Sequence, residues 1–447
     1  MQRKLTFSLL FAIAVLYLVL GWRYATQTPD WQVPDEPAHY NYIRQLVAES
    51  KIPVINMGDW DTEYQNLLTS TGFNPVHLNE LNRIEYEDHQ PPLYYLLAAP
   101  VYKISDGDLT TLRLFSVLIG LGAVLTAFAA VYLLFPETPW LGLSTAAFIA
   151  FLPQNLTFLS GVNNDPLAEL MVGINLLGIV FYLKKSSIQH RDALLLGVLV
   201  GIALLTKATI YFLAGIAGLA ILLRWRRERW PWRTLVQHLA YFLIPALLLG
   251  GLWWGRNLSV YGGVDFLGLQ RHDEVAAGQL QTDEYVERDL NGSRSTYYKN
   301  YAYTTFHSFW GQFGWMAVPM PSRMYRILLG IAVFMLAGLV PYFSQNYKQF
   351  TVEQWEMLLL FDLVMVLVIA AYMIYNLQFV QFQGRYLYPA LIPFGFIVAA
   401  GLSGWMEVFA RRIPILRWAP VLIVMLLAGL AWYALETYII PNLPRWS

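Results

Sequence analysis

The chain has 447 residues, of which 57% are hydrophobic and 13% are charged. Soluble globular proteins carry about 25% charged residues, so this composition is typical of an integral membrane protein. The formal net charge is zero, which argues against a nucleic-acid-binding protein, and the absence of cysteine excludes disulfides, thiolate zinc ligands and thiol catalysis.

An apolar run at residues 5–22 is the first predicted element, and Arg3 and Lys4 precede it. This run is longer than the apolar core of a secretory signal, which has about 7–15 residues. We therefore expect a retained first transmembrane helix, with a cleaved signal peptide as the alternative.

A helix of about 20 apolar residues crosses a bilayer. By this criterion the sequence predicts an all-α polytopic membrane protein with about eleven spans. The expected spans lie at residues 5–22, 110–135, 140–159, 166–184, 192–206, 208–224, 234–254, 325–343, 354–376, 387–409 and 416–438. Only Lys207 separates 192–206 from 208–224, so this pair is compatible with a tight hairpin or with one broken helix.

Short loops rich in lysine and arginine alternate with short loops that carry few of these residues. Under the positive-inside rule, this pattern places the N-terminus in the cytoplasm. Two long loops, 23–109 and 255–324, then lie on the extracytoplasmic side. We expect one integral domain, residues 1–447, in the cell membrane, with no internal repeat.

Two short helices are predicted inside the first long loop. Residues 38–49 mix apolar and polar side chains at helical spacing directly after Pro37. The apolar segment 91–100 is too short to cross a bilayer, so we expect it to lie in the membrane interface as an amphipathic helix.

The first long loop begins with adjacent carboxylates, Asp35 and Glu36, and His39 follows closely. A carboxylate held at a membrane surface can act as a general base, an effect of about 10²–10⁴-fold. Asp35 and Glu36 are therefore the candidate catalytic residues, and His39 is a candidate substrate ligand. The alternative is the start of a helix, where carboxylates and proline are favoured.

The same loop places Asp88 and His89 just before the predicted interfacial helix. An acid beside an imidazole suits the binding of a polar substrate or the orientation of a base. A capped helix start is the alternative interpretation.

Asp165 and Lys207 fall at the predicted outer ends of spans. Asp165 is a candidate ligand for a metal or a polar substrate, or alternatively the N-cap of span 166–184. A lysine at the centre of a bilayer costs about 2.5–3.5 kcal/mol and usually faces a polar pathway. We expect Lys207 to bind an anionic group such as phosphate, unless it only extends to the membrane surface.

Arg256 and Arg385 lie beside aromatic residues at the outer interface. Arginine binds phosphate through two parallel hydrogen bonds, so both are candidate phosphate ligands. Gly384 strengthens the case for Arg385, because glycine lets the backbone approach a ligand closely. A contact with lipid headgroups is the alternative.

The chain resembles GT-C-type glycosyltransferases, in particular the protein O-mannosyltransferase-like group and its bacterial relatives. Residues 35–40 (DEPAHY) are similar to the Asp-Glu-x-x-His-Phe signature of that group, and residues 88–93 (DHQPPL) resemble its Asp-x-His-Pro-Pro-Leu element. Gln90 stands where that element has histidine. The layout is also similar: a first span, a large outer loop with interfacial helices, and a bundle of many spans.

This resemblance implies an inverting transferase that takes a sugar from a polyprenyl-phosphate carrier and gives it to a hydroxyl acceptor on a lipid, glycan or protein of the cell envelope. Asp35 would take the proton of the acceptor, and Lys207, Arg256 or Arg385 would neutralise the departing phosphate. Some relatives use a divalent metal, Mg²⁺ or Mn²⁺, for which Asp35 and Asp165 are the candidate ligands.

A transporter or flippase for a lipid-linked or anionic substrate is the main alternative, because it too would have many spans. Transporters place polar residues near the bilayer midplane, often in repeated halves. Here the polar groups are concentrated outside the spans, which favours a surface site and an enzyme.

Overall fold

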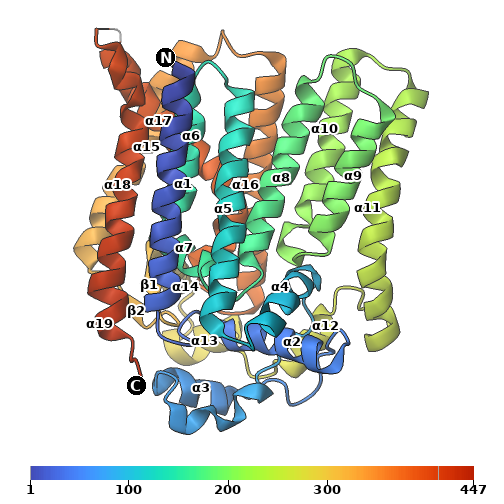
Figure 1. The fold of residues 1–447 in the computed structure, drawn as a ribbon, viewed down its shortest axis with the longest axis vertical. Helices are drawn as coiled ribbons and strands as arrows, with labels where there is room; N and C mark the ends of the chain where they lie inside the picture. The colour runs from blue at the N-terminus through green and yellow to red at the C-terminus, as the bar shows by residue number, and fades with distance from the viewer. Residues whose placement is uncertain (1, 411, 447) are drawn as a thin grey trace.

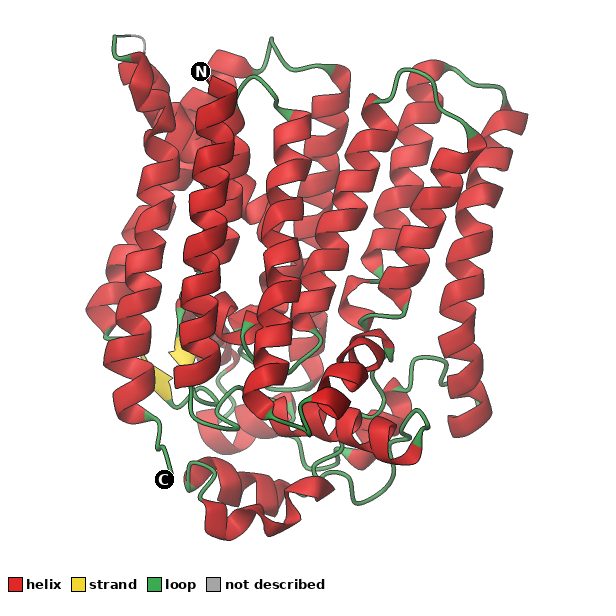
Figure 2. Ribbon diagram, viewed as in Figure 1, coloured by secondary structure: helices red, strands yellow, loops and turns green. Residues whose placement is uncertain are grey.

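The computed structural model describes residues 2–410 and 412–446. Helices make up nearly all of the secondary structure in these residues (Figure 2). The described strands are β1 (Gln312–Phe313) and β2 (Val318–Pro319), which pair antiparallel. The long helices run side by side, and the short ones gather at the end of the bundle opposite the N-terminus (Figure 1).

Nine helices of the described chain are long and apolar enough to cross a membrane. They are α1 (Gln2–Gln27), α5 (Leu109–Leu134), α8 (Asp165–Lys184), α10 (Phe212–Glu228) with the preceding turn η2 (Ala208–Ile210), α11 (Trp232–Tyr261), α15 (Ser322–Asn346), α16 (Val352–Gln378), α17 (Leu391–Ala410) with η3 (Gly384–Ala390), and α18 (Ala419–Ala434) with η4 (Pro414–Trp418), η5 (Leu435–Ile439) and α19 (Ile440–Asn442). The protein is thus a multi-pass membrane protein.

The predicted span 140–159 is not one continuous helix. It consists of α6 (Pro139–Phe151) and α7 (Pro153–Leu159), bent by 69° at Leu152. Pro153 has no amide hydrogen to donate and disfavours a helical backbone at the residue before it, which explains the break. If the bent pair is one span, the described chain has ten.

The predicted span 192–206 is a helix of 15 residues, α9 (His190–Leu204), which is short for a membrane crossing. A helix therefore occupies each of the predicted spans, but the expected number of eleven is not confirmed. Helices α9 and α10 are separate and joined by a turn that contains Lys207.

The core of the bundle lies around α6, whose 13 residues are all buried. A helix that is apolar on every side belongs inside a protein, and α6 packs against α1, α5, α17 and α18. In another part of the bundle, small residues let helices α15 and α17 approach each other closely. A Cβ atom on Gly338 of α15 would lie 2.0 Å from the carbonyl oxygen of Gly401 in α17.

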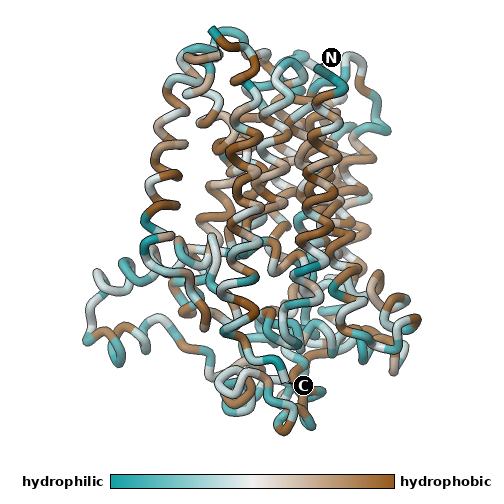
Figure 3. The backbone as a smooth tube through the Cα atoms, turned by 60° about the vertical axis from the view of Figure 1, so that its left-hand side comes forward, coloured by the Kyte–Doolittle hydropathy of each residue, from teal (hydrophilic) through white to brown (hydrophobic). Residues whose placement is uncertain are grey.

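The two long loops gather at one end of the bundle (Figure 1). They form α2 (Glu36–Glu49), α3 (Thr62–Ser70), η1 (Pro75–Arg83), α4 (Leu93–Ile104), α12 (Leu269–Val275), α13 (Thr282–Leu290) and α14 (Arg294–Trp310). The helices expected at 38–49 and 91–100 are present as α2 and α4. Figure 3 shows that apolar residues dominate the long helices, whereas this end mixes hydrophilic and hydrophobic stretches.

Candidate active site

Asp35 occupies the position just before α2 and has a left-handed backbone, with φ of 66°. This conformation is uncommon for residues other than glycine, although aspartate and asparagine tolerate it best. Its Oδ1 accepts a hydrogen bond of 2.7 Å from the Tyr86 hydroxyl. Its Oδ2 forms an ion pair with Arg385, so the carboxylate links the start of α2 to η3, the turn before α17.

The surroundings of Asp35 keep it ionised. Burial alone raises the pKa of this carboxyl, but Arg385, His39 and the Tyr86 hydroxyl outweigh burial and hold the pKa below its usual range. Asp35 is therefore a carboxylate at neutral pH and able to accept a proton or a hydrogen bond.

A tight turn at the start of η3 positions Arg385 beside Asp35. A Cβ atom on Gly384 would lie 2.3 Å from the backbone nitrogen of Phe309, so this position requires glycine. The Arg385 guanidinium stacks on Phe158 of α7, 4.8 Å from the ring centroid. The bend between α6 and α7 thus places an aromatic ring in cation–π contact with the guanidinium.

A second ion pair lies beside the first. Lys207, in the turn after α9, contacts Asp165 at the start of α8. Asp165 is near enough to Arg385 for its charge to act on that residue. We call Asp35, Arg385, Asp165 and Lys207 the charge cluster. Each of its side chains is between 13% and 23% exposed, so they lie in a partly open and weakly screened place.

His39 lies one turn along α2 and is close to the charge cluster. Its Nδ1 is 2.8 Å from the Tyr95 hydroxyl of α4. Burial is the largest influence on the imidazole and lowers its pKa, which favours the neutral form. A neutral imidazole can donate or accept a hydrogen bond, so the placement fits a substrate ligand.

Glu36 points away from the charge cluster and is fully buried against Arg113 of α5. Its Oε2 accepts a hydrogen bond of 2.6 Å from Arg113, and its Oε1 accepts bonds from Arg113 and from the backbone nitrogen of Val162. Arg113 also donates to the carbonyl oxygens of Ala25, Thr28 and Pro29. Glu36 therefore has a structural environment that ties α1, α2 and α5 together, with no oxygen left for substrate.

Asp88 and His89 are buried at the turn before α4. Asp88 Oδ2 accepts a hydrogen bond of 2.7 Å from Gln45, and His89 Nδ1 lies 3.0 Å from the carbonyl oxygen of Tyr86. These contacts are with α2 and the first loop itself, so the structure does not join either residue directly to Asp35.

Arg256 also lies apart from the charge cluster. It contacts the carbonyl oxygens of Ile52 and Pro53 and stacks on Trp253, 4.9 Å from the ring centroid. These contacts fasten the first long loop to the end of α11. The role of phosphate ligand predicted for Arg256 gains no support from this position.

The residues expected to hold Mg²⁺ or Mn²⁺ do not fit a metal. Asp35 and Asp165 each contact a cationic side chain, Arg385 and Lys207 respectively, which takes the place that a metal would need.

Sequence reasoning also missed Tyr86, the hydroxyl donor to Asp35. A tyrosine inside an acidic segment was the only signal for it.

Comparison with known proteins identifies a family and a fold. The family model described as "Predicted membrane protein (DUF2142)" matches residues 62–394. No curated protein matches the sequence.

Two solved structures of ArnT from Cupriavidus metallidurans resemble almost the whole chain. The structure bound to undecaprenyl phosphate has a TM-score of 0.53 at 14% identity, covering 97% of this chain and 66% of ArnT. The apo structure has a TM-score of 0.50 at 15% identity, covering 99% and 67%. The chain thus spans about two thirds of the length of ArnT. This likeness shows a GT-C-like fold, as the sequence resemblance predicted.

Proposed function

Because this chain belongs to the DUF2142 family of predicted membrane proteins and has a GT-C-like fold, we propose that it is a membrane glycosyltransferase that uses a polyprenyl-phosphate-linked sugar. The sugar goes to a hydroxyl acceptor. Support for the carrier comes from ArnT, one structure of which is described as bound to undecaprenyl phosphate.

The charge cluster is the observation that carries this proposal. It places one ionised carboxylate, Asp35, directly against a cation, Arg385, and sets a second cation, Lys207, nearby. Transfer of a sugar from a phosphate carrier needs this combination: a base for the acceptor, and positive charge for the leaving phosphate.

In the proposed reaction Asp35 accepts the proton of the acceptor hydroxyl as its oxygen attacks the anomeric carbon. The bond between that carbon and the phosphate oxygen breaks, and the electron pair stays on the polyprenyl phosphate. Arg385 and Lys207 stabilise the developing negative charge. A single displacement of this kind inverts the anomeric centre, and His39 binds the sugar or the acceptor.

The Asp35–Arg385 ion pair gives donor binding a further effect. A carrier phosphate competes with Asp35 for the guanidinium of Arg385. Once Arg385 turns to the phosphate, Asp35 loses its main positive partner, and its pKa rises toward the range of a useful base. The base is thus held inactive until the donor is present.

We place this reaction on the extracytoplasmic side. The lysine- and arginine-rich short loops lie at the end of the bundle near the N-terminus, opposite the charge cluster. The positive-inside rule assigns that end to the cytoplasm. The donor needs no nucleotide there, because the carrier phosphate already activates the sugar.

The deciding experiment compares wild type with Asp35→Asn in nanodiscs. A panel of polyprenyl-phosphate sugars is supplied with membrane extract as acceptor, and release of free polyprenyl phosphate is followed by mass spectrometry. Asparagine tolerates the left-handed backbone at position 35, so this variant should fold. We expect release by wild type and a loss of about 10²–10⁴-fold in the variant.

Asp106→Asn is the matched control, because Asp106 is an exposed acid of the same loop with a left-handed backbone. It should keep wild-type activity. If wild type releases carrier phosphate from no donor, the transporter alternative replaces this proposal.

A further inference from the structure

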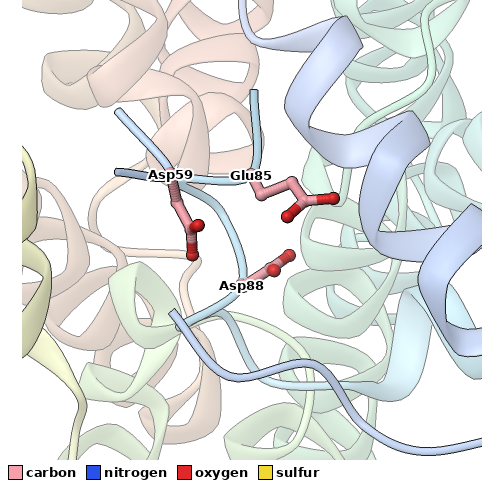
Figure 4. A group of neighbouring side chains, drawn as sticks. All are labelled: Asp59, Glu85 and Asp88. Atoms are coloured by element: carbon pink, nitrogen blue, oxygen red, sulfur yellow. The ribbon is translucent and has the colours of Figure 1, made fainter. Parts of the chain in front are cut away.

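Three carboxylates that the proposed reaction does not use converge in the first long loop. One ligand oxygen each from Asp59, Glu85 and Asp88 lies within 4.8 Å of the other two. In Figure 4, Asp59 comes from one stretch of the loop, and Glu85 and Asp88 come from a second stretch beside it.

The buried member of this group has an oxygen without a partner. Asp88 is 0% exposed, and its Oδ1 has no hydrogen-bond partner among the described residues, although its Oδ2 accepts a hydrogen bond from Gln45.

The local cations offset this charge only in part. Arg44 contacts Glu85 Oε1 at 2.8 Å, and Arg271 acts on Asp59 by its charge. Within residues 2–410 and 412–446, these three carboxylates thus face one another with one direct cationic contact. Like charges this close are unfavourable unless protons or a metal ion lie between them.

We propose that Asp59, Glu85 and Asp88 bind a hard divalent cation, with Ca²⁺ as the best fit. Three oxygen atoms that lie within 4.8 Å of one another share a point no farther than about 2.8 Å from each, so a shift of a few tenths of an ångström brings all three into the Ca²⁺–oxygen range of about 2.3–2.6 Å. The group contains no nitrogen or sulfur ligand, which favours Ca²⁺, Mg²⁺ or Mn²⁺ over zinc or copper.

The cation would fasten together two segments that position Asp35. The backbone nitrogen of Glu85 already donates to the carbonyl oxygen of Asp59, at 3.1 Å. Trp60, next to Asp59, packs edge-on against Tyr86, with ring centroids 4.9 Å apart. Tyr86 in turn donates its hydroxyl to Asp35. This metal site is distinct from the charge cluster and acts on it through Tyr86.

The test uses full-length protein in nanodiscs, stripped with EDTA and titrated with CaCl₂ by calorimetry and thermal unfolding. We expect one Ca²⁺ per chain and a rise in Tm on binding. Asp59→Asn and Asp88→Asn should each weaken Ca²⁺ by at least about 10-fold and abolish the Tm rise. Glu63→Gln, an exposed acid of the same loop, is the matched control and should bind as wild type does.

Terbium luminescence keeps the proposal testable if the aspartate variants fail to fold. Tb³⁺ bound at this site should be excited through Trp60 and Tyr86, displaced by Ca²⁺, and weaker in emission in Trp60→Phe, which keeps all three ligands. Binding of Mg²⁺ or Mn²⁺ that is lost in both aspartate variants also supports the site. No binding of any of these ions by stripped wild type overturns it, as does unchanged affinity in both variants or unchanged emission in Trp60→Phe. None of these measurements depends on the proposed transferase activity.

Discussion

At the scale of single residues, Asp35 and Glu36 are neighbours with different environments. Asp35 is partly exposed and contacts Arg385, whereas Glu36 is sealed against Arg113. The left-handed backbone at Asp35 sends the two side chains in different directions. Replacing one member of a buried ion pair typically costs about 3–5 kcal/mol, so a loss of activity in a Glu36 variant would report folding and not chemistry.

Under the proposed function, the pH profile of carrier-phosphate release should depend on Arg385. Arg385 lowers the pKa of Asp35, so wild type keeps an ionised base down to low pH. In Arg385→Gln that pKa rises, and the base is lost at a higher pH as the solution is acidified. We therefore expect the acid limb of kcat/KM to move to higher pH, together with a rate loss of about 10²–10³-fold.

Release of carrier phosphate across a pH series measures this shift. Arg294→Gln serves as the control, because Arg294 is an exposed residue of α14 paired with Asp283. Its profile should match wild type. An acid limb that stays in place in Arg385→Gln would mean that Asp35 is not the base.

The sequence supplied the members of the charge cluster but not their pairing. Asp35, Asp165, Lys207 and Arg385 each stood out as a charge at a membrane surface. Which acid meets which cation depends on helix packing, because Asp35 and Arg385 are 350 positions apart in the chain. For the same reason the buried partner of Glu36 and the contact from Tyr86 were not predictable.

At the scale of elements, apolar runs predicted the positions of the helices well. The α6–α7 bend was missed because the run 140–159 is mostly apolar and long enough for one span, although Pro153, followed by the polar Gln154 and Asn155, marks the break in the sequence. Hydropathy averaged over a stretch of sequence reflects composition, so it does not detect the backbone hydrogen bond that is lost at Pro153. That bend is what brings Phe158 against Arg385, so the missed feature belongs to the site.

The packing of α15 against α17 predicts a sharp difference between two glycines of one helix. Gly338→Ala places a Cβ atom 2.0 Å from the carbonyl oxygen of Gly401, so the helices must separate. Overpacking of this kind costs about 1–3 kcal/mol. Gly330 has open space around it, and Gly330→Ala should be neutral or stabilising by up to about 1 kcal/mol.

Thermal unfolding in detergent distinguishes the two variants. A lower Tm for Gly338→Ala beside an unchanged or higher Tm for Gly330→Ala is the expected result. Equal Tm values for both would contradict the close contact between α15 and α17.

At the scale of the whole molecule, the absence of cysteine makes the proposed orientation directly measurable. Every single-cysteine variant carries one reactive thiol. Val76 is 74% exposed in the first long loop, and Ser187 is exposed in the short loop between α8 and α9. With the N-terminus inside, Val76→Cys reacts with a membrane-impermeant maleimide in intact cells, and Ser187→Cys reacts only after the membrane is opened.

The reverse labelling pattern would place the charge cluster in the cytoplasm. A cytoplasmic site would still suit a lipid-linked donor, but the acceptor would then be a cytoplasmic molecule. The experiment therefore decides which pool of acceptors is relevant.

The long separation between Asp35 and Arg385 also bears on how the protein is made. A ribosome completes the first long loop, with its carboxylate, long before it reaches the arginine near the start of α17. A chain interrupted before that point inserts into the membrane with an acid but without the guanidinium that meets it. Only a nearly finished polypeptide holds both halves of the pair, so under the proposed mechanism a prematurely terminated product would be harmless to the pool of lipid-linked sugar.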